Sequence, residues 1–195
     1  MPLRRADESA EYFLEKRCRP PASEAATGRA LCATPSQRWI GGAVDQDEMM
    51  SLFRVHRDAE ARRDYDAVMD TFTADCYLET VALGTRSEGR EAARAAYVGY
   101  FTAFPDLAPE DEGFAGGDDF LVSWGTLRGT SKGPWLEVPP GGGSFAVGFT
   151  NVSAFKDGLM HGETIYFDLA TLCEQAGVPL EPIRAAAAAR RLGAA

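Results

Sequence analysis

The residues best suited to acid–base chemistry gather in the last strand-like segment, Leu159–Phe167, and just after it. His161, Glu163 and Asp168 all carry side chains that can transfer protons. Because side chains alternate across a β-strand, His161 and Glu163 share one face of this segment and Asp168 belongs to the other. The pattern therefore predicts proton transfer. The sequence has no Gly-rich phosphate loop, Ser-His-Asp pattern or His-Glu-x-x-His helix to suggest another chemistry.

Each of these residues also has a structural alternative. Glu163 either acts as a general acid/base, with a pKa raised by an apolar cavity, or forms an ion pair with an arginine of a helix or of a partner subunit. Asp168 immediately precedes a predicted helix, Leu169–Ala176, so it either caps that helix or belongs to a site. His161 lies close to the turn at Asp157-Gly158, which favours the rim of a cavity over its interior.

Composition and charge exclude several kinds of partner. Hydrophobic residues make up 45% of the 195 residues and charged residues 25%, as in ordinary globular proteins. Residues 1–44 hold seven Lys/Arg and five Asp/Glu, whereas the rest of the chain is strongly acidic and the formal net charge is -9. An acidic domain repels phosphate backbones and anionic lipids, so we expect no nucleic-acid or membrane partner. The sequence also lacks an apolar run typical of a membrane span or a signal segment, which predicts a cytoplasmic location.

The cysteines are widely spaced and show no CxxC pattern. They are Cys18, Cys32, Cys76 and Cys173. This spacing favours neither a disulfide framework nor a zinc site, so we expect free thiols and no metal.

The chain divides into three segments. Residues 1–44 form an extension that we predict to be partly irregular, with a short helix over Glu11–Arg17 ended by Pro20-Pro21. Residues 45–178 have the periodic patterns of a domain. Residues 179–195 are an Ala-rich tail that favours helix by propensity, although little in it demands burial.

Within residues 45–178, helical patterns come first and strand patterns follow. The spacing predicts helices beginning at Asp45 or Asp47, over Tyr65–Phe72, and from Gly89 to Phe104, with a strand over Cys76–Ala82. Later strands are predicted as a short one before the Gly116–Asp119 hairpin, then Phe120–Gly129, Ser144–Phe155 and Leu159–Phe167. This order is typical of an α+β fold in which helices pack on one side of a curved antiparallel sheet and leave a cavity at its wide end.

Several motifs in this order resemble those of one family. They are Arg63-Asp64-Tyr65-Asp66, Phe72-Thr73-Ala74-Asp75, Gly89-Arg90-Glu91, Phe104-Pro105-Asp106, Trp124-Gly125-Thr126, Asp157-Gly158, and Tyr166–Leu172 with Gln175-Ala176-Gly177. Residues 45–178 thereby resemble the SnoaL-like polyketide cyclases and ester cyclases of the nuclear transport factor 2-like superfamily. The resemblance implies a cone-shaped, cystatin-like sheet wrapped by three N-terminal helices. It also implies a homodimer that needs no metal or organic cofactor and performs acid–base chemistry on small apolar ketones, esters or epoxides.

The family's own acid/base positions do not carry titratable groups here. In an alignment from Asp157-Gly158, the aspartate of the polyketide cyclases falls on Ile165, the strand histidine on Asn151, and a further histidine on Leu127. The aldol-type cyclase mechanism is therefore not supported. The alignment also directs Ile165 into the pocket, and with it Glu163, which becomes the predicted acid/base.

The remaining candidates would bind the substrate. We expect Asn151 to hydrogen-bond a carbonyl oxygen and stabilise an enolate or alkoxide, with Tyr65 or Tyr77 polarising the same oxygen. His56 is either a satisfied core histidine or a pocket donor, and Trp135 either a lid or a surface or dimer contact. The other candidates for the apolar lining, each with plain core as its alternative, are Trp124, Tyr97, Phe101, Phe104, Phe149 and Ile165.

Two functions follow from these patterns. The first is a cofactor-independent cyclase, isomerase or epoxide-opening hydrolase that acts on a small apolar metabolite, such as a polyketide-like intermediate. The second is a non-catalytic ligand-binding or dimerisation module of the same fold, which the replacements at Leu127, Asn151 and Ile165 favour.

Overall fold

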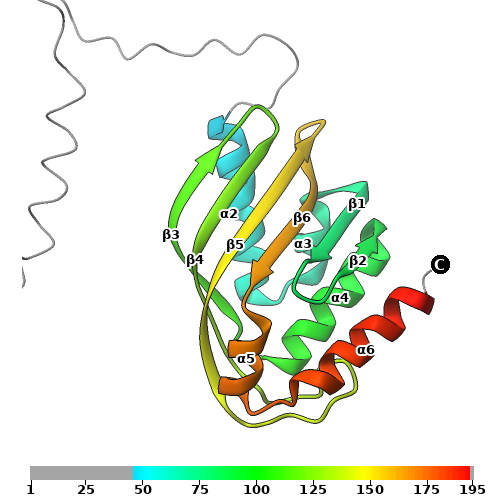
Figure 1. Ribbon diagram of the computed structural model, residues 1–195. Coiled ribbons are helices and arrows are strands. Elements are labelled where there is room, and N and C mark those ends of the chain that lie inside the picture. The colour runs from blue at the N-terminus through cyan, green and yellow to red at the C-terminus, as the bar shows by residue number, and fades with distance from the viewer. Residues whose placement is uncertain (1–45, 194–195) are drawn as a thin grey trace, which may run out of the picture. The chain divides into compact units, whose positions relative to one another are not determined.

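The computed structural model describes residues 46–193, and the predictions for residues 1–44, Cys18 and Cys32 included, lie outside them. The described residues form a curved sheet with helices packed on one face, the α+β arrangement that the sequence predicts (Figure 1). The helices are α2 (Gln46–Arg62), α3 (Tyr65–Asp70), α4 (Gly89–Ala103), α5 (Leu169–Ala176) and α6 (Leu180–Gly193). The strands are β1 (Phe72–Thr80), β2 (Thr85–Glu88), β3 (Ala108–Gly116), β4 (Phe120–Thr130), β5 (Ser144–Lys156) and β6 (Leu159–Phe167).

The strands lie in the order β2-β1-β6-β5-β4-β3. The prediction of an antiparallel sheet is wrong at one place, because β1 and β6 pair in parallel. A parallel pair needs a long connection, and the segment between these strands, with α4 and the other four strands, supplies it. The short strand β2, which the sequence patterns did not reveal, pairs with β1 and forms one edge of the sheet.

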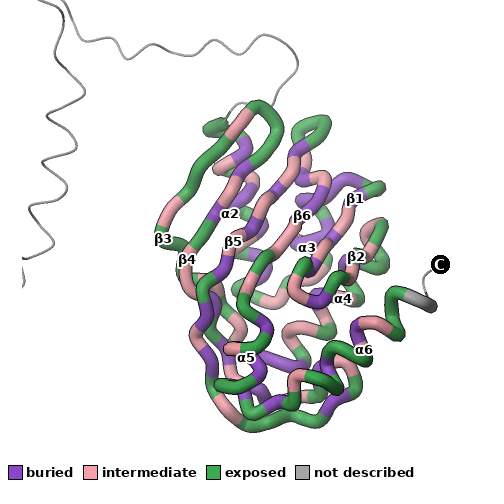
Figure 2. The backbone as a smooth tube through the Cα atoms, viewed as in Figure 1, coloured by how far each residue is buried: buried purple, intermediate pink, exposed green. Residues whose placement is uncertain are grey.

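Strand alternation places the core between the sheet and the helices. Along β5, buried residues alternate with more exposed ones (Figure 2). Phe145, Val147 and Phe149 are among the buried residues. On α2, the fully buried side chains of Met49, Phe53 and His56 recur at helical spacing and turn the same side of the helix toward the sheet.

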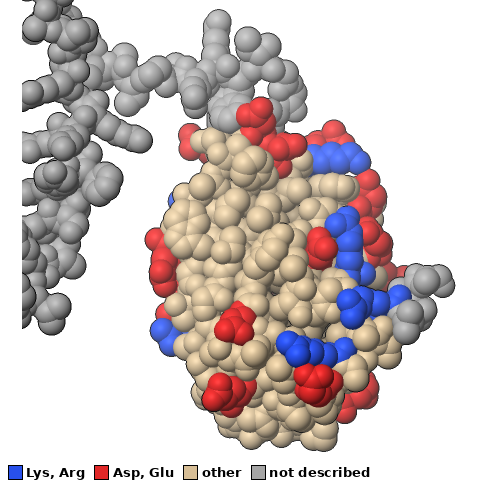
Figure 3. Space-filling model, viewed as in Figure 1, with Lys and Arg blue, Asp and Glu red and all other residues tan. Residues whose placement is uncertain are grey.

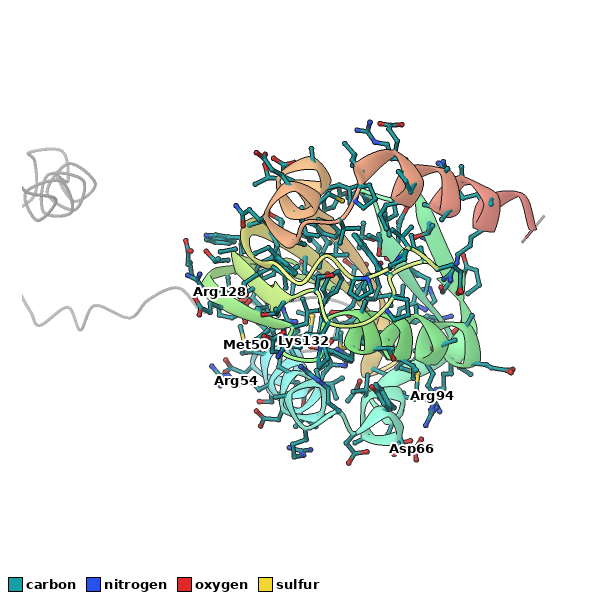
Figure 4. The ribbon with its side chains drawn as sticks, turned by 90° about the horizontal axis from the view of Figure 1, so that it is seen from below. Met50, Arg54, Asp66, Arg94, Arg128 and Lys132 are labelled. Carbon is teal, nitrogen blue, oxygen red and sulfur yellow. The ribbon has the colours of Figure 1, made fainter. Side chains whose placement is uncertain are left out.

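Local signals set the ends of several helices. The helix α2 ends at Arg62, because the next residue, Arg63, has a φ of 59° that breaks the helical path. Asp64 then caps α3 by accepting a hydrogen bond from the Ala67 amide. Charged side chains at this end point to solvent, and Arg94 of α4 pairs there with Asp66 of α3 (Figure 4).

The described residues include two cysteines, Cys76 and Cys173, and both are free and buried. Between residues 46 and 193, every helix is too short or too polar to cross a lipid bilayer.

The C-terminal helix α6 belongs to the core more than its composition indicates. Ile183 is completely buried and Ala187 nearly so, and both pack in the same apolar cluster as Leu172 of α5. We therefore expect Ile183→Ala to lower the free energy of unfolding by about 2–4 kcal/mol, because it removes a buried side chain and leaves a cavity. Chemical denaturation would measure this, with Arg184→Ala on the exposed side of the same helix as the control. Equal stability of the two variants would contradict the packing of α6.

Candidate functional site

An apolar cavity lies between the concave face of the sheet and α4. The cavity has a volume of about 90 Å³, several times what one water molecule needs. Its walls come mostly from aromatic and aliphatic side chains: Leu78, Tyr100, Phe101, Phe104, Leu107, Pro109, Leu127, Trp135, Phe145, Ile165, Phe167 and Leu172. The cavity is therefore suited to a small apolar molecule.

A group of polar side chains also reaches this otherwise apolar cavity. Arg57 and Glu60 come from α2, Tyr97 from α4, Asn151 from β5 and Glu163 from β6. Glu60, Tyr97, Asn151 and Glu163 are all at least about nine-tenths buried. Buried charges are costly unless they are paired, so the partners of these groups determine what they can do.

His56 lies behind the cavity wall and connects these groups. Its Nδ1 lies 2.8 Å from the Thr71 hydroxyl, and that hydroxyl donates to the Val68 carbonyl at 2.6 Å. Because the only hydrogen of Thr71 is used there, Nδ1 of His56 must be the donor to Thr71. Its Nε2 then faces the Tyr97 hydroxyl at 3.2 Å, Glu60 at 3.4 Å and Glu163 at 3.6 Å.

Glu163 is bonded through both carboxylate oxygens. The Tyr97 hydroxyl donates a short hydrogen bond to Oε2, and the Asn151 amide donates to Oε1 at 2.6 Å. Glu60 pairs with Arg57 at 3.0 Å, and the other side of the Arg57 guanidinium lies 3.6 Å from Asp111 of β3. The two buried carboxylates are thus balanced by His56 and Arg57.

This balance sets the protonation states. Burial alone lowers the pKa of His56, but the negative charges of Glu60 and Glu163 and their hydrogen bonds outweigh it and raise that pKa to about 9. For Glu163, burial alone raises the pKa, but the charges of His56 and Arg57 and the bonds from His56 and Tyr97 lower it to about 2. The pKa of Tyr97 rises well above 10, because of burial and the charge of Glu163. At neutral pH, His56 is therefore protonated, Glu163 ionised and Tyr97 neutral.

One group of described residues could reach a metal ion. Donor atoms of His56, Glu60 and Glu163 lie within 4.8 Å of one another, a set that zinc or iron can use. A metal would have to displace the Nε2 proton of His56, and the Arg57 cation already compensates Glu60. The negative charges of Glu60 and Glu163 are therefore already balanced by the protonated His56 and by the Arg57 guanidinium.

Comparisons with known proteins agree with this architecture. The family model of the SnoaL-like polyketide cyclases matches residues 51–176. The chain belongs to this family. Similar solved structures include a putative SnoaL-like polyketide cyclase from Jannaschia sp. CCS1, at 23% identity with a TM-score of 0.63, covering 71% of this chain and 99% of that one. TsrD from Streptomyces laurentii is 24% identical with a TM-score of 0.59, covering 69% and 98%. IdmH, a putative polyketide cyclase from Streptomyces antibioticus, is 21% identical with a TM-score of 0.55, covering 66% and 98%. No functionally curated relative matches the chain.

The three positions at which the family resemblance places acid/base groups all line the cavity. They are Leu127, Asn151 and Ile165. Tyr97, Phe101 and Phe104 of the predicted lining are also in its wall, as is Trp135, which is buried against Phe104. The cavity of this SnoaL-like chain is thus lined by the three positions that the resemblance indicates. Its charged side chains, however, are at other positions of the chain.

His161 does not line the cavity, neither in its interior nor at the rim where the sequence places it. Between β5 and β6 the register changes from Ala154–Gly162 to Phe155–Met160, so His161 is an extra residue in a β-bulge. The bulge turns Met160 into the core, whereas His161 packs edge-on against Tyr77 and bonds to the Thr73 hydroxyl at 3.1 Å, away from the cavity.

Other predicted site residues also lie elsewhere. Asp168 is exposed and caps α5, where its carboxylate accepts from the amide and the hydroxyl of Thr171. Trp124 is 40% exposed on the outer face of the sheet. Neither predicted tyrosine reaches the cavity, because Tyr65 packs on Phe101 from the helix side and Tyr77 on His161. Phe149 is core beside Arg57.

Sequence reasoning missed Arg57, Glu60 and Tyr100. One signal was available on α2: Met49, Phe53, His56 and Glu60 follow one another at helical spacing, so the apolar stripe continues into two titratable side chains. A buried polar pair on an apolar stripe indicates a partner across the core, which here is Glu163.

The paired charges should make stability depend on pH in two windows. His56 has a folded pKa of about 9, above its ordinary 6.5, so its contribution is complete below pH 6.5 and is lost as the pH rises through 9. Glu163 has a folded pKa of about 2, below its ordinary 4.5, so its contribution is present above pH 4.5 and is lost as the pH falls toward 2.

The first window can be tested with His56→Gln, which removes the titrating group. The free energy of unfolding of the wild type relative to this variant should shrink between pH 6.5 and 9, by on the order of 3 kcal/mol. Urea denaturation at a series of pH values measures the difference. A difference that stays constant across this range would contradict the protonated state of His56.

Proposed function

We propose that this SnoaL-like protein is a cofactor-independent enzyme in which Glu163 accepts a proton from a small apolar substrate and Tyr97, backed by His56, supplies one. A single observation carries the proposal: an ionised carboxylate and a protonated imidazole, joined by a tyrosine, lie at the polar end of an apolar cavity. Environments that push two pKa values apart, here to about 2 and about 9, distinguish the base from the acid.

The charge state of Glu163 differs from the sequence-based expectation and narrows the chemistry. A carboxyl with a raised pKa would be a proton donor near neutrality, whereas the paired Glu163 is an acceptor. Its low basicity favours substrates with an acidic proton, such as a carbon between two carbonyl groups. Tyr97 lines the cavity, so an oxygen that gains charge there can receive its hydrogen, and the Nε2 proton of His56 can replace it.

The reaction class that fits is a proton-transfer isomerisation or cyclisation of an oxygen-bearing apolar molecule. An epoxide opening uses the same pair. Glu163 takes a proton from water as the water oxygen bonds to an epoxide carbon, and Tyr97 protonates the epoxide oxygen as its bond to that carbon breaks. The cavity walls exclude bulk water from these groups because they are almost wholly aromatic and aliphatic.

A second candidate function is a non-catalytic ligand-binding module. The observation that favours it is that both oxygens of Glu163 already accept hydrogen bonds within the protein. Catalysis therefore requires the Tyr97 bond to change partner when a substrate enters.

Substitution of Glu163 separates the two functions. In a panel of β-keto esters, β,γ-unsaturated ketones and epoxides followed by mass spectrometry, Glu163→Gln should lower kcat/KM on the order of a hundredfold, because the amide cannot accept a proton. Asp168→Asn is the matched control and should keep turnover, since Asp168 caps an exposed helix end. Full turnover by Glu163→Gln, or none by the wild type on any substrate class, would contradict the enzymatic proposal.

The outer face of the sheet supports a homodimer as the working form. This face is turned to the viewer in Figure 3 and carries few charged side chains. Trp124, Thr150 and Tyr166 lie in one row across β4, β5 and β6, and the two aromatic side chains are 40% and 46% exposed. Exposed apolar side chains in a row mark interaction surfaces, and a second copy offers the same self-complementary row.

Light scattering after size exclusion tests the dimer. The wild type should have twice the chain mass, and Trp124→Glu combined with Tyr166→Glu should have the mass of one chain, because charges buried without partners oppose association. Val55→Glu, at an exposed apolar position of α2, is the control and should stay dimeric. A monomeric wild type, or a dimeric double variant, would show that this face is not the interface.

A further inference from the structure

One atom of the Asn151 side chain has no hydrogen-bond partner in the part of the chain that the structure describes. Asn151 is 3% exposed and lines the cavity, yet its Oδ1 accepts no hydrogen bond. Leaving a buried acceptor without a donor is unfavourable, so such atoms normally accept a hydrogen bond from the protein, an ordered water or a ligand.

The orientation of this amide is fixed by its neighbours. Its Nδ2 donates to Glu163 Oε1 at 2.6 Å and lies 3.5 Å from the Ser153 hydroxyl. Turning the amide over would place Oδ1 against an ionised carboxylate oxygen, two acceptors with no hydrogen between them. One of the two amide hydrogens of Asn151 is thus used by Glu163 and the other faces the Ser153 hydroxyl. A hydrogen bond from Asn151 to a substrate carbonyl stays a prediction, and it would have to use the hydrogen that now faces Ser153.

None of the described residues donates a hydrogen bond to Asn151 Oδ1, and the buried Ser123 hydroxyl, whose residue pairs with Asn151 across β4 and β5, also makes no hydrogen bond with them. The Tyr97 hydroxyl, the nearest described donor to the carboxylate, gives its hydrogen to Glu163. Arg57 also lines the cavity, and its buried Nε–H and the Nη2 group facing Asp111 make no hydrogen bond. Asn151 and Arg57, which both line the cavity, thus hold a buried acceptor and buried N–H groups that have no hydrogen-bond partner among the described residues.

We infer that the cavity recognises an apolar molecule that bears a hydroxyl group, as an alcohol, a phenol or an enol, with the hydroxyl hydrogen donated to Asn151 Oδ1. A hydroxyl both donates and accepts, so its oxygen is also compatible with the free N–H groups of Arg57. A ketone or ether offers only an acceptor and leaves Oδ1 unsatisfied. The inference rests on the proposed function in that it names the substrate class of the same cavity.

In the proposed reaction, this selects a substrate with a hydroxyl next to the reacting carbon, or the enol that forms when Glu163 has taken the carbon-bound proton and Tyr97 has protonated the oxygen. Glu163 lies beside the bound hydroxyl because Asn151 bonds to both. Asn151 would then bind the substrate hydroxyl and fix its position relative to the base.

Three probes of similar size test the inference by isothermal titration calorimetry. They are 4-ethylphenol, which has a donor, 4-ethylanisole, which has only an acceptor, and 1-ethyl-4-fluorobenzene, which has neither but matches the phenol in size. The wild type should bind the phenol about fivefold tighter than either of the others, the factor that corresponds to one net hydrogen bond.

Variants assign the preference to Asn151. Asn151→Leu should bind the three probes without a preference for the phenol. Ser123→Ala is the matched control, because Ser123 pairs with Asn151 across β4 and β5 and does not line the cavity. Its buried hydroxyl, too, has no partner between residues 46 and 193. The Ser123→Ala variant should keep the preference.

Each result has a distinct meaning. Equal binding of the three probes by the wild type overturns the inference and leaves the proposed function standing, since the cavity still takes apolar molecules. Binding of none of them removes both. A preference that persists in folded Asn151→Leu also overturns the inference, because another group would then be the acceptor.

Discussion

The interaction on which the site depends is the hydrogen-bonded chain from His56 through Tyr97 to Glu163. It joins α2, α4 and β6, three elements that come from distant parts of the sequence. Without His56, the buried Glu163 would have no cation within ion-pair distance among the described residues, at a cost of about 3–5 kcal/mol. Without Glu163, His56 would keep Glu60 as its one charged partner. The chain therefore holds the helices to the sheet at the end of the cavity where chemistry is proposed.

The apolar remainder of the cavity follows from this arrangement. Two carboxylates and two cations balance one another at one end, so the other walls can be built from Phe, Leu and Trp without further polar partners. A ligand can therefore place its apolar part against the aromatic and aliphatic walls and its polar group at the charged end of the cavity. It is the pattern of a small-molecule pocket rather than of a packed core.

Sequence patterns predicted those parts that depend on local order. The limits of β6 and α5 agree with the predicted segments, because turn residues and a capping Asp168 define them within a few positions. The family resemblance correctly indicated the fold and the positions of Leu127, Asn151 and Ile165 in the cavity wall. Features that depend on pairing between distant segments could not be predicted from the sequence patterns or from the resemblance. The bulge at His161 is visible only in the register with β5, and the low pKa of Glu163 arises from His56 and Arg57, more than a hundred positions earlier in the chain.

The hydrogen bond of Thr71 to the Val68 carbonyl has a consequence for the direction of proton movement. Since the Thr71 hydroxyl can only accept from His56, the Nδ1 hydrogen is retained in both charge states of the ring. The proton that His56 gains or loses is always the one on Nε2, the side of Tyr97 and the carboxylates. The imidazole therefore exchanges protons only with Tyr97 and the carboxylates. No proton passes from His56 through Thr71 toward α3.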